Sequence, residues 1–103
     1  MEEGKLNKKK LLDLVATNKQ TIRGFGVSHL GLFGSFARNE QNEKSDIDFL
    51  VDFEPDYYKY HNFIELAYYL EKLFNRKVEV VTRKGLSPYM GPKILSEVEN
   101  IPL

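Results

Sequence analysis

The chain has 103 residues, of which 42% are hydrophobic and 29% charged, proportions typical of a folded globular protein. Fifteen basic residues balance fifteen acidic ones, and this zero net charge argues against a dedicated nucleic-acid-binding protein, which needs a basic face. The sequence contains no cysteine, which excludes disulfides and thiolate zinc sites.

The first ten residues, MEEGKLNKKK, are charged and lack the apolar segment of a secretory signal. No later segment is long and apolar enough to cross a bilayer. These features predict a cytoplasmic protein without membrane contact. At this length the chain has room for one hydrophobic core, so we expect residues 1–103 to form a single domain.

Helix and strand patterns alternate along the chain and predict a small α/β sheet. The expected elements, in chain order, are a helix from about Asn7 to Arg23, a strand at Ser28–Phe33, a polar loop at Asn39–Lys44, a strand at Asp46–Phe53, a helix spanning Phe63 to Phe74, a strand at Lys77–Thr82 and a short helix at Pro92–Val98. The clearest period belongs to the helix that contains Leu66 and Leu70, whose apolar residues recur every three or four positions. That pattern indicates an amphipathic helix covering a sheet.

The pair Gly34-Ser35 ends the strand predicted at Ser28–Phe33, just before the polar loop. Glycine lets the backbone approach a ligand, and we expect the N–H groups of residues 35–37 to open a helical turn, a structure that attracts phosphate. The Ser35 hydroxyl adds a donor. Arg38 is interpreted either as a phosphate ligand or, preferably, as half of a structural ion pair.

Two carboxylates interrupt the strand predicted at Asp46–Phe53. Side chains alternate across a strand, so Asp46 and Asp48 share one face, with their α-carbons about 6.6 Å apart. Carboxylates held this close repel each other unless one is protonated or a cation lies between them. Mg²⁺ prefers oxygen ligands and often keeps substrate phosphates in its shell, so the pattern suggests a magnesium site and a triphosphate substrate. For Asp46 alone, an ordinary polar residue at the start of a strand remains an alternative.

Glu79 is a third candidate carboxylate. It alternates with Val78 and Val80 and therefore faces away from them. If its strand pairs beside Asp46–Phe53, Glu79 stands next to the aspartates, where it can bind a metal and accept the proton of an attacking hydroxyl. A solvated strand residue is the alternative interpretation.

The motif formed by Gly34-Ser35, ten intervening residues and Asp46-x-Asp48 resembles the signature of the DNA polymerase β-type nucleotidyltransferase superfamily. The segments GSFAR and SDIDFLV resemble most closely its minimal nucleotidyltransferases, small proteins paired with HEPN toxins. This resemblance implies the polymerase β-like fold, a small mixed sheet flanked by helices. It also implies that Gly34 and Ser35 hold the triphosphate, while Asp46 and Asp48 bind Mg²⁺, with a two-metal site expected.

In the same resemblance, Glu79 takes the third-carboxylate position, where aspartate is usual, and Asn39 stands where glycine is usual. Asparagine tolerates a left-handed backbone better than most residues, so Asn39 is compatible with the motif.

The function implied by the resemblance is Mg²⁺-dependent transfer of AMP from ATP to a hydroxyl of a partner protein. The expected acceptor is a tyrosine of a HEPN toxin, which would make this chain an antitoxin. The short chain has no room for the added helical domains that hold the acceptor in larger relatives, so we expect the acceptor to bring its own surface. Two alternatives remain open: a non-catalytic antitoxin that neutralises a toxin by contact, and an enzyme that adenylylates a small molecule.

Overall fold

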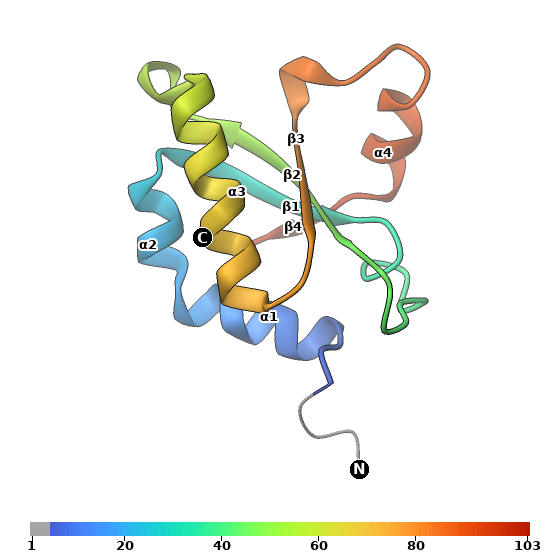
Figure 1. Cartoon of the computed structure of the whole chain (residues 1–103). Coiled ribbons are helices and arrows are strands. Elements are labelled where there is room, and N and C mark those ends of the chain that lie inside the picture. Colours follow the sequence, from blue (N-terminus) through green and yellow to red (C-terminus); the bar gives the residue numbers. More distant parts are fainter. Residues whose placement is uncertain (1–4) are drawn as a thin grey trace.

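A four-stranded mixed sheet with helices on both faces forms the fold (Figure 1). It is described by a computed structural model for residues 5–103. The strands are β1 (Val27–Phe33), β2 (Ile47–Phe53), β3 (Val78–Thr82) and β4 (Glu99–Ile101), in the order β3-β2-β1-β4. β1 pairs antiparallel with β2 and β4, whereas β2 pairs parallel with β3. The α/β class and the small mixed sheet flanked by helices are thereby confirmed.

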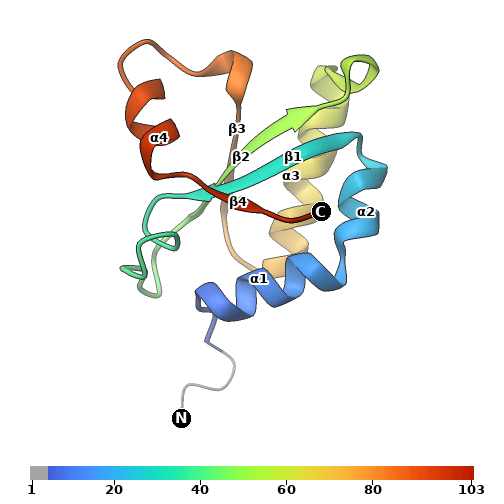
Figure 2. The same cartoon turned by 180° about the vertical axis from the view of Figure 1, so that it is seen from behind.

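The helices divide between the two faces of the sheet (Figures 1 and 2). On one face lie α1 (Lys8–Thr17), α2 (Lys19–Gly24) and α3 (Tyr60–Phe74), and on the other lies α4 (Gly91–Glu97). Two short 3-10 helices, η1 (Pro55–Tyr57) and η2 (Arg83–Gly85), follow β2 and β3. Within residues 5–103, no helix has the length and apolar character required to cross a membrane.

The single helix expected over Asn7–Arg23 is wrong, because the chain forms two helices there. Asn18 ends α1 with φ −110° and ψ 16°, outside the helical region. Its backbone N–H donates to the carbonyls of Leu14 and Val15, and its side-chain amide donates to Leu14 as well. The buried positions Val15 and Ile22 continue across this break, so hydrophobic spacing alone did not reveal it.

The main core lies between the sheet and the three helices α1, α2 and α3. Alternate residues of β2 face this core and are at most 5% exposed, as the strand pattern predicted: Ile47, Phe49, Val51 and Phe53. Leu66, Leu70 and Phe74 of α3 cover them with the predicted apolar stripe. Burying side chains of this size is the main source of stability in such a core.

The opposite face of the sheet holds a smaller cluster and is the face that carries Asp48. Phe33 and Leu50 of the sheet pack there with Ile94 of α4, and Asp48 precedes Leu50 by two positions on β2. α4 leads into β4, which pairs with the middle of β1 and was not predicted from the sequence. A three-residue strand is too short to show the alternation by which longer strands are recognised.

Candidate active site

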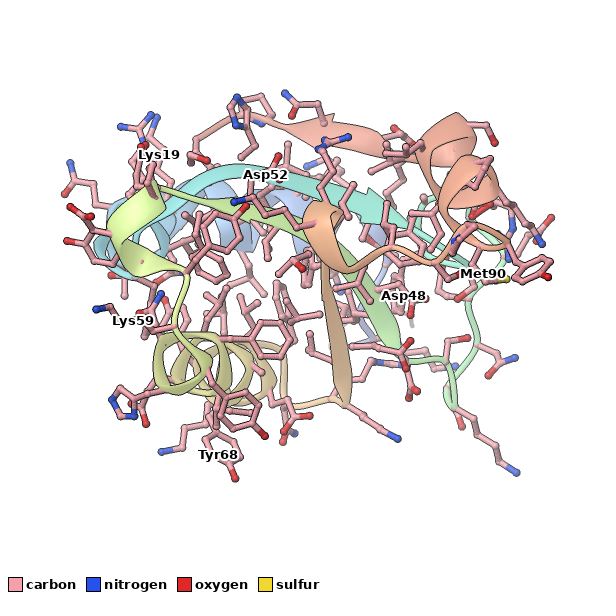
Figure 3. All side chains as sticks on the ribbon, turned by 90° about the horizontal axis from the view of Figure 1, so that it is seen from above. Lys19, Asp48, Asp52, Lys59, Tyr68 and Met90 are labelled. Atoms are coloured by element: carbon pink, nitrogen blue, oxygen red, sulfur yellow. The ribbon has the colours of Figure 1, made fainter. Side chains whose placement is uncertain are left out.

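A groove of about 330 Å³ opens between the Asp48 face of the sheet and α4. Four of the six residues selected from the sequence line it: Gly34, Arg38, Asp48 and Glu79. The other wall comes from η2, the segment after it and α4, and includes Leu86, Ser87, Met90, Lys93 and Glu97. Figure 3 shows Asp48 and Met90 at the same end of the molecule. Ser35 and Asp46 lie outside this lining: Ser35 directly follows Gly34 in the chain, and Asp46 lies two positions before Asp48.

The parallel pairing of β2 and β3 places Asp48 beside Glu79. The two residues are partners in the register, so their α-carbons are separated by the spacing of neighbouring strands, about 4.8 Å. The expected pairing of these strands is therefore what the structure shows. Asp46 immediately precedes β2 and acts electrostatically on Asp48. The roles of these carboxylates as metal ligands or as a base stay predictions.

The surroundings of Asp48 in the groove disfavour the charged form of its carboxyl. Burial, followed by the charges of Glu79 and Asp46, raises the pKa of the Asp48 carboxyl from 3.8 to about 6, while Arg38 opposes the rise. A bound cation relieves this kind of repulsion, and carboxylate oxygens are the donors that a hard cation such as Mg²⁺ prefers. The donor chemistry therefore fits Mg²⁺, although no three acidic or histidine side chains among residues 5–103 are already grouped as a metal centre.

Asp48→Asn is expected to stabilise the metal-free protein at neutral pH. Because folding raises this pKa, the protonated form is favoured in the folded state, and that stability is present below about pH 4 and lost as the pH rises through about 6. The variant should gain about 1–2 kcal/mol in the free energy of unfolding at pH 7.5, a value discounted for partial exposure, and little at pH 4. Urea unfolding in EDTA at both pH values measures this.

Asp52→Asn is the matched control for that measurement. Asp52 lies on the same face of β2 but accepts a hydrogen bond from Nε of Arg83 at 3.1 Å. Its substitution should therefore leave stability unchanged or slightly lower. A clear loss of stability in metal-free Asp48→Asn at pH 7.5 would instead mean that Asp48 has a fixed structural partner.

Gly34 brings the backbone into contact with Asp48. Its φ is +77°, and a Cβ atom at this position would lie only 2.1 Å from Oδ2 of Asp48. No side chain fits there without displacing the carboxylate. The close approach in the structure is to the Asp48 carboxylate, and the approach to a ligand that was expected of this glycine stays a prediction.

The helical turn expected after Gly34 remains a single turn, because residues 35–39 do not continue into a helix. The Arg38 N–H donates to the Gly34 carbonyl at 3.2 Å, and the Glu40 N–H donates to the Ser35 carbonyl at 2.9 Å. Asn39 adopts φ +58°, the left-handed conformation, which ends the turn before a second helical turn forms. This conformation accounts for an asparagine where related motifs have glycine.

Arg38 is engaged in ion pairs, the interpretation preferred from the sequence. Its Nη1 donates to both carboxylate oxygens of Glu97, at 2.9 and 3.1 Å, and its Nε donates to Glu40 at 2.9 Å. Glu97 also accepts a hydrogen bond of 3.2 Å from the Gly34 N–H. Sequence analysis missed Glu97, since a single glutamate in a short helix gives no sign of a partner 59 residues away.

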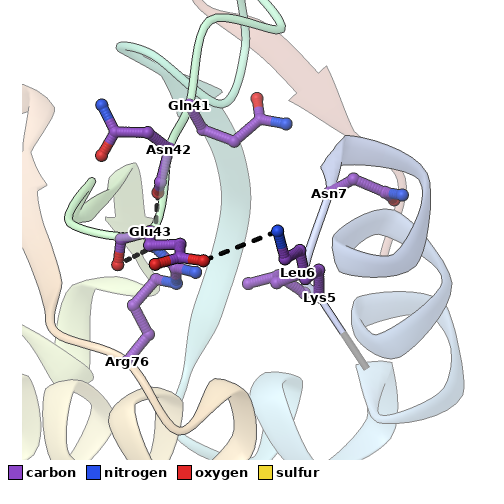
Figure 4. A pocket seen from close by; sticks show the side chains of 7 residues that line it. All are labelled: Lys5, Leu6, Asn7, Gln41, Asn42, Glu43 and Arg76. Carbon is purple, nitrogen blue, oxygen red and sulfur yellow. Dashed lines mark hydrogen bonds and ion pairs between the residues drawn. The ribbon is translucent and has the colours of Figure 1, made fainter. Parts of the chain in front are cut away.

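A second cavity, of about 310 Å³, lies beside the loop that links Gly34-Ser35 to Asp46 (Figure 4). Its lining residues are Lys5, Leu6, Asn7, Gln41, Asn42, Glu43 and Arg76. The Lys5 Nζ lies 3.5 Å from a Glu43 carboxylate oxygen, and Arg76 Nη1 donates to the carbonyls of Asn42 and Ser45 at 3.0 and 2.7 Å. Arg76 therefore fixes the end of the loop that precedes Asp46. Arg76 is a positioning residue that no sequence pattern indicated.

Comparisons with known proteins identify related sequences and similar folds. The profile of the family described as nucleotidyltransferase domain matches residues 8–101. Protein adenylyltransferase MntA from Thermococcus cleftensis is 42% identical over 87 residues, covering 82% of this chain and 85% of that protein. A solved structure provisionally assigned as a minimal nucleotidyltransferase matches with a TM-score of 0.81 at 30% identity, over 97% of this chain and 99% of that chain. A crystal structure of a toxin–antitoxin with AMP-PNP matches with a TM-score of 0.67 at 24% identity, over 94% and 73% of the two chains, and shows the shared fold alone.

Proposed function

Because the chain belongs to the nucleotidyltransferase domain family and is a transferase of the minimal nucleotidyltransferase type, we propose that it moves AMP from ATP to a hydroxyl of a partner protein, with Mg²⁺ as cofactor. The observation that carries this proposal is the placement of Asp48, Glu79 and Gly34 around one groove. The name of the relative from Thermococcus cleftensis, a protein adenylyltransferase, supports AMP and a protein acceptor. We also propose that residues 1–103 act as one domain, in the cytoplasm.

In this proposal each selected residue has a defined task. Asp46, Asp48 and Glu79 hold the metal, which when bound neutralises charge on the phosphates. The Gly34 N–H, the Ser35 hydroxyl and the Arg38 guanidinium orient the triphosphate. In this arrangement the bound Mg²⁺ would offset the mutual repulsion of the three carboxylates.

The reaction exchanges one bond for another at the α-phosphorus of ATP. The acceptor oxygen forms a bond to this phosphorus, the bond to the bridging oxygen of the β-phosphate breaks, and pyrophosphate leaves. The proton of the acceptor hydroxyl passes to the Glu79 carboxylate. The exposed position of Glu79 on β3 leaves it accessible to an acceptor that arrives from outside.

We infer that the acceptor is a tyrosine of a HEPN toxin, so that this chain acts as an antitoxin. The groove is walled on one side by the segment that carries Met90, whose neighbour Tyr89 is 91% exposed, so a protein surface can approach it. Residues 5–103 add no further helical layer around the groove that could enclose a small acceptor. The toxin–antitoxin structure that shares the fold makes a toxin the first partner to test.

Mg²⁺ and ATP together are expected to stabilise the wild-type protein. A ligand at 100 times its dissociation constant adds about 2.7 kcal/mol, which raises Tm by several degrees in a domain of this size. The shift should disappear with EDTA or in Asp48→Asn, because the metal then lacks its central ligand. Differential scanning fluorimetry measures it, and Asp52→Asn, whose carboxylate pairs with Arg83, should keep the full shift. An equal shift in Asp48→Asn would contradict the proposed site.

A further inference from the structure

The carboxylate of Glu97 occupies donors that the proposed triphosphate would use. It accepts from the Gly34 N–H at 3.2 Å and from Nη1 of Arg38 at 2.9 and 3.1 Å. A guanidinium that contacts both oxygens of an oxyanion, together with a backbone N–H, is a common way to bind phosphate as well as carboxylate. The Glu97 side chain is 22% exposed and lines the same groove as Asp48.

We propose that Glu97 is a built-in competitor of the nucleotide phosphates. In the nucleotide-free protein it satisfies Gly34 and Arg38, and it sets the affinity for ATP because the phosphates must displace it from these donors. This inference rests on the proposed function and adds to it a residue that determines nucleotide affinity.

The charges around the groove indicate that Glu97 competes with the triphosphate and does not help to bind it. The cations that line it are Arg38 and Lys93, whereas Asp48, Glu79 and Glu97 contribute negative charge. An arriving triphosphate is itself strongly negative, so it is repelled by Glu97 and shares Arg38 with it. Removing the charge of Glu97 leaves Arg38 available to the phosphates.

α4 and the residues after it make contacts with the sheet besides those of Glu97, so we expect the helix to stay in place when the carboxylate leaves its donors. Ile94 packs with Phe33 and Leu50 beneath the helix. After α4, Val98 lies against Gly31, where an added Cβ would come within 2.5 Å of Val98 Cγ2. β4 then pairs with β1 through backbone hydrogen bonds. These apolar and backbone contacts join α4 to the sheet independently of the Glu97 carboxylate.

The test is the affinity of Glu97→Gln for phosphates. Glutamine keeps the size of the side chain and an oxygen that can accept from the Gly34 N–H, but it removes the charge. The Kd for ATP with Mg²⁺, measured by isothermal titration calorimetry, should fall about 3- to 10-fold relative to the wild type. Tripolyphosphate should show the same gain, whereas adenosine, which has no phosphate, should show none.

Glu40→Gln is the matched control, because Glu40 also pairs with Arg38, through Nε, whereas the Gly34 N–H donates to Glu97. Its Kd for ATP should stay within about twofold of the wild-type value. Urea unfolding establishes that each variant is folded. Should Glu97→Gln fold poorly, Glu97→Asp keeps the charge on a shorter side chain, and its loosened contacts should give a smaller gain in affinity.

The outcomes separate this inference from the proposed function. An unchanged Kd in a folded Glu97→Gln protein would mean that Glu97 is only structural, and weaker binding would mean that Glu97 positions Arg38 for the phosphates. Either result overturns the inference that Glu97 competes with the phosphates, while the nucleotidyltransferase proposal stands. A wild type that binds neither Mg²⁺–ATP nor tripolyphosphate overturns the proposed function itself.

Discussion

Glu79→Gln is expected to lower the rate of AMP transfer to a protein hydroxyl by about 10²–10⁴-fold, the loss typical of removing a general base. Glutamine keeps nearly the volume of glutamate but cannot accept the acceptor's proton. Nucleotide binding should survive, because Asp48 and the Gly34 backbone still line the groove. The measurement is mass spectrometry of a candidate toxin after incubation with ATP and Mg²⁺, which detects each added AMP, beside a pull-down of the same toxin.

Glu79→Asp is the control for this substitution. Aspartate restores the charge, so much of the activity should return, and it should rise above wild type if the shorter side chain places the carboxylate better. If transfer occurs and Glu79→Gln leaves its rate unchanged, Glu79 is not the base. If the wild type binds the toxin tightly and never adds AMP, the catalytic proposal fails for that pair, and neutralisation by contact replaces it.

Gly34→Ala is expected to destabilise the fold by about 2–4 kcal/mol and to abolish the stabilisation by Mg²⁺ and ATP. The added Cβ would lie 2.1 Å from Oδ2 of Asp48, and φ +77° is unfavourable for alanine. Both the backbone and the carboxylate must therefore move, which disturbs the proposed metal ligand and the phosphate donor together. Urea unfolding measures the first effect and differential scanning fluorimetry the second.

Gly24→Ala is the matched control for Gly34→Ala. Gly24 is the last residue of α2, and a Cβ there meets no atom within 4 Å apart from its chain neighbours and the backbone of its own helix. The substitution should leave ligand binding intact and stabilise the fold by up to about 1 kcal/mol, because alanine favours helix more than glycine does. A Gly34→Ala protein with wild-type stability and a full ligand-induced shift would show that Asp48 does not depend on this glycine.

The sequence predicted those parts of the site that follow from alternation along one strand. The pattern of β2 separates Asp48 from the buried Phe49 and Val51, and the structure keeps that separation. The pairing of Asp48 with Glu79 was conditional on which strands are neighbours, a question that spacing within a strand does not answer. The sequence therefore identified Asp48 and Glu79 as candidate residues but did not establish that their strands are neighbours in the sheet.

The missed features depend on contacts between distant parts of the chain. Glu97 reaches Gly34 across 63 positions, and Arg76 reaches the carbonyl of Ser45 across 31. Each is a single side chain whose partner is selected by the tertiary fold, so no periodicity or motif marks it. The break at Asn18 differs, since there a local hydrogen bond overrides a continuous apolar stripe.

The groove has a consequence for the order in which the chain folds. Its walls come from β1, β2, β3 and α4, and α4 is held beside the sheet through the pairing of β4 with β1, which joins residues about 70 positions apart. Contacts between such distant segments close large loops and form late. A chain in which β4 is not paired with β1 therefore has no complete groove, and the proposed ability to modify another protein requires that pairing.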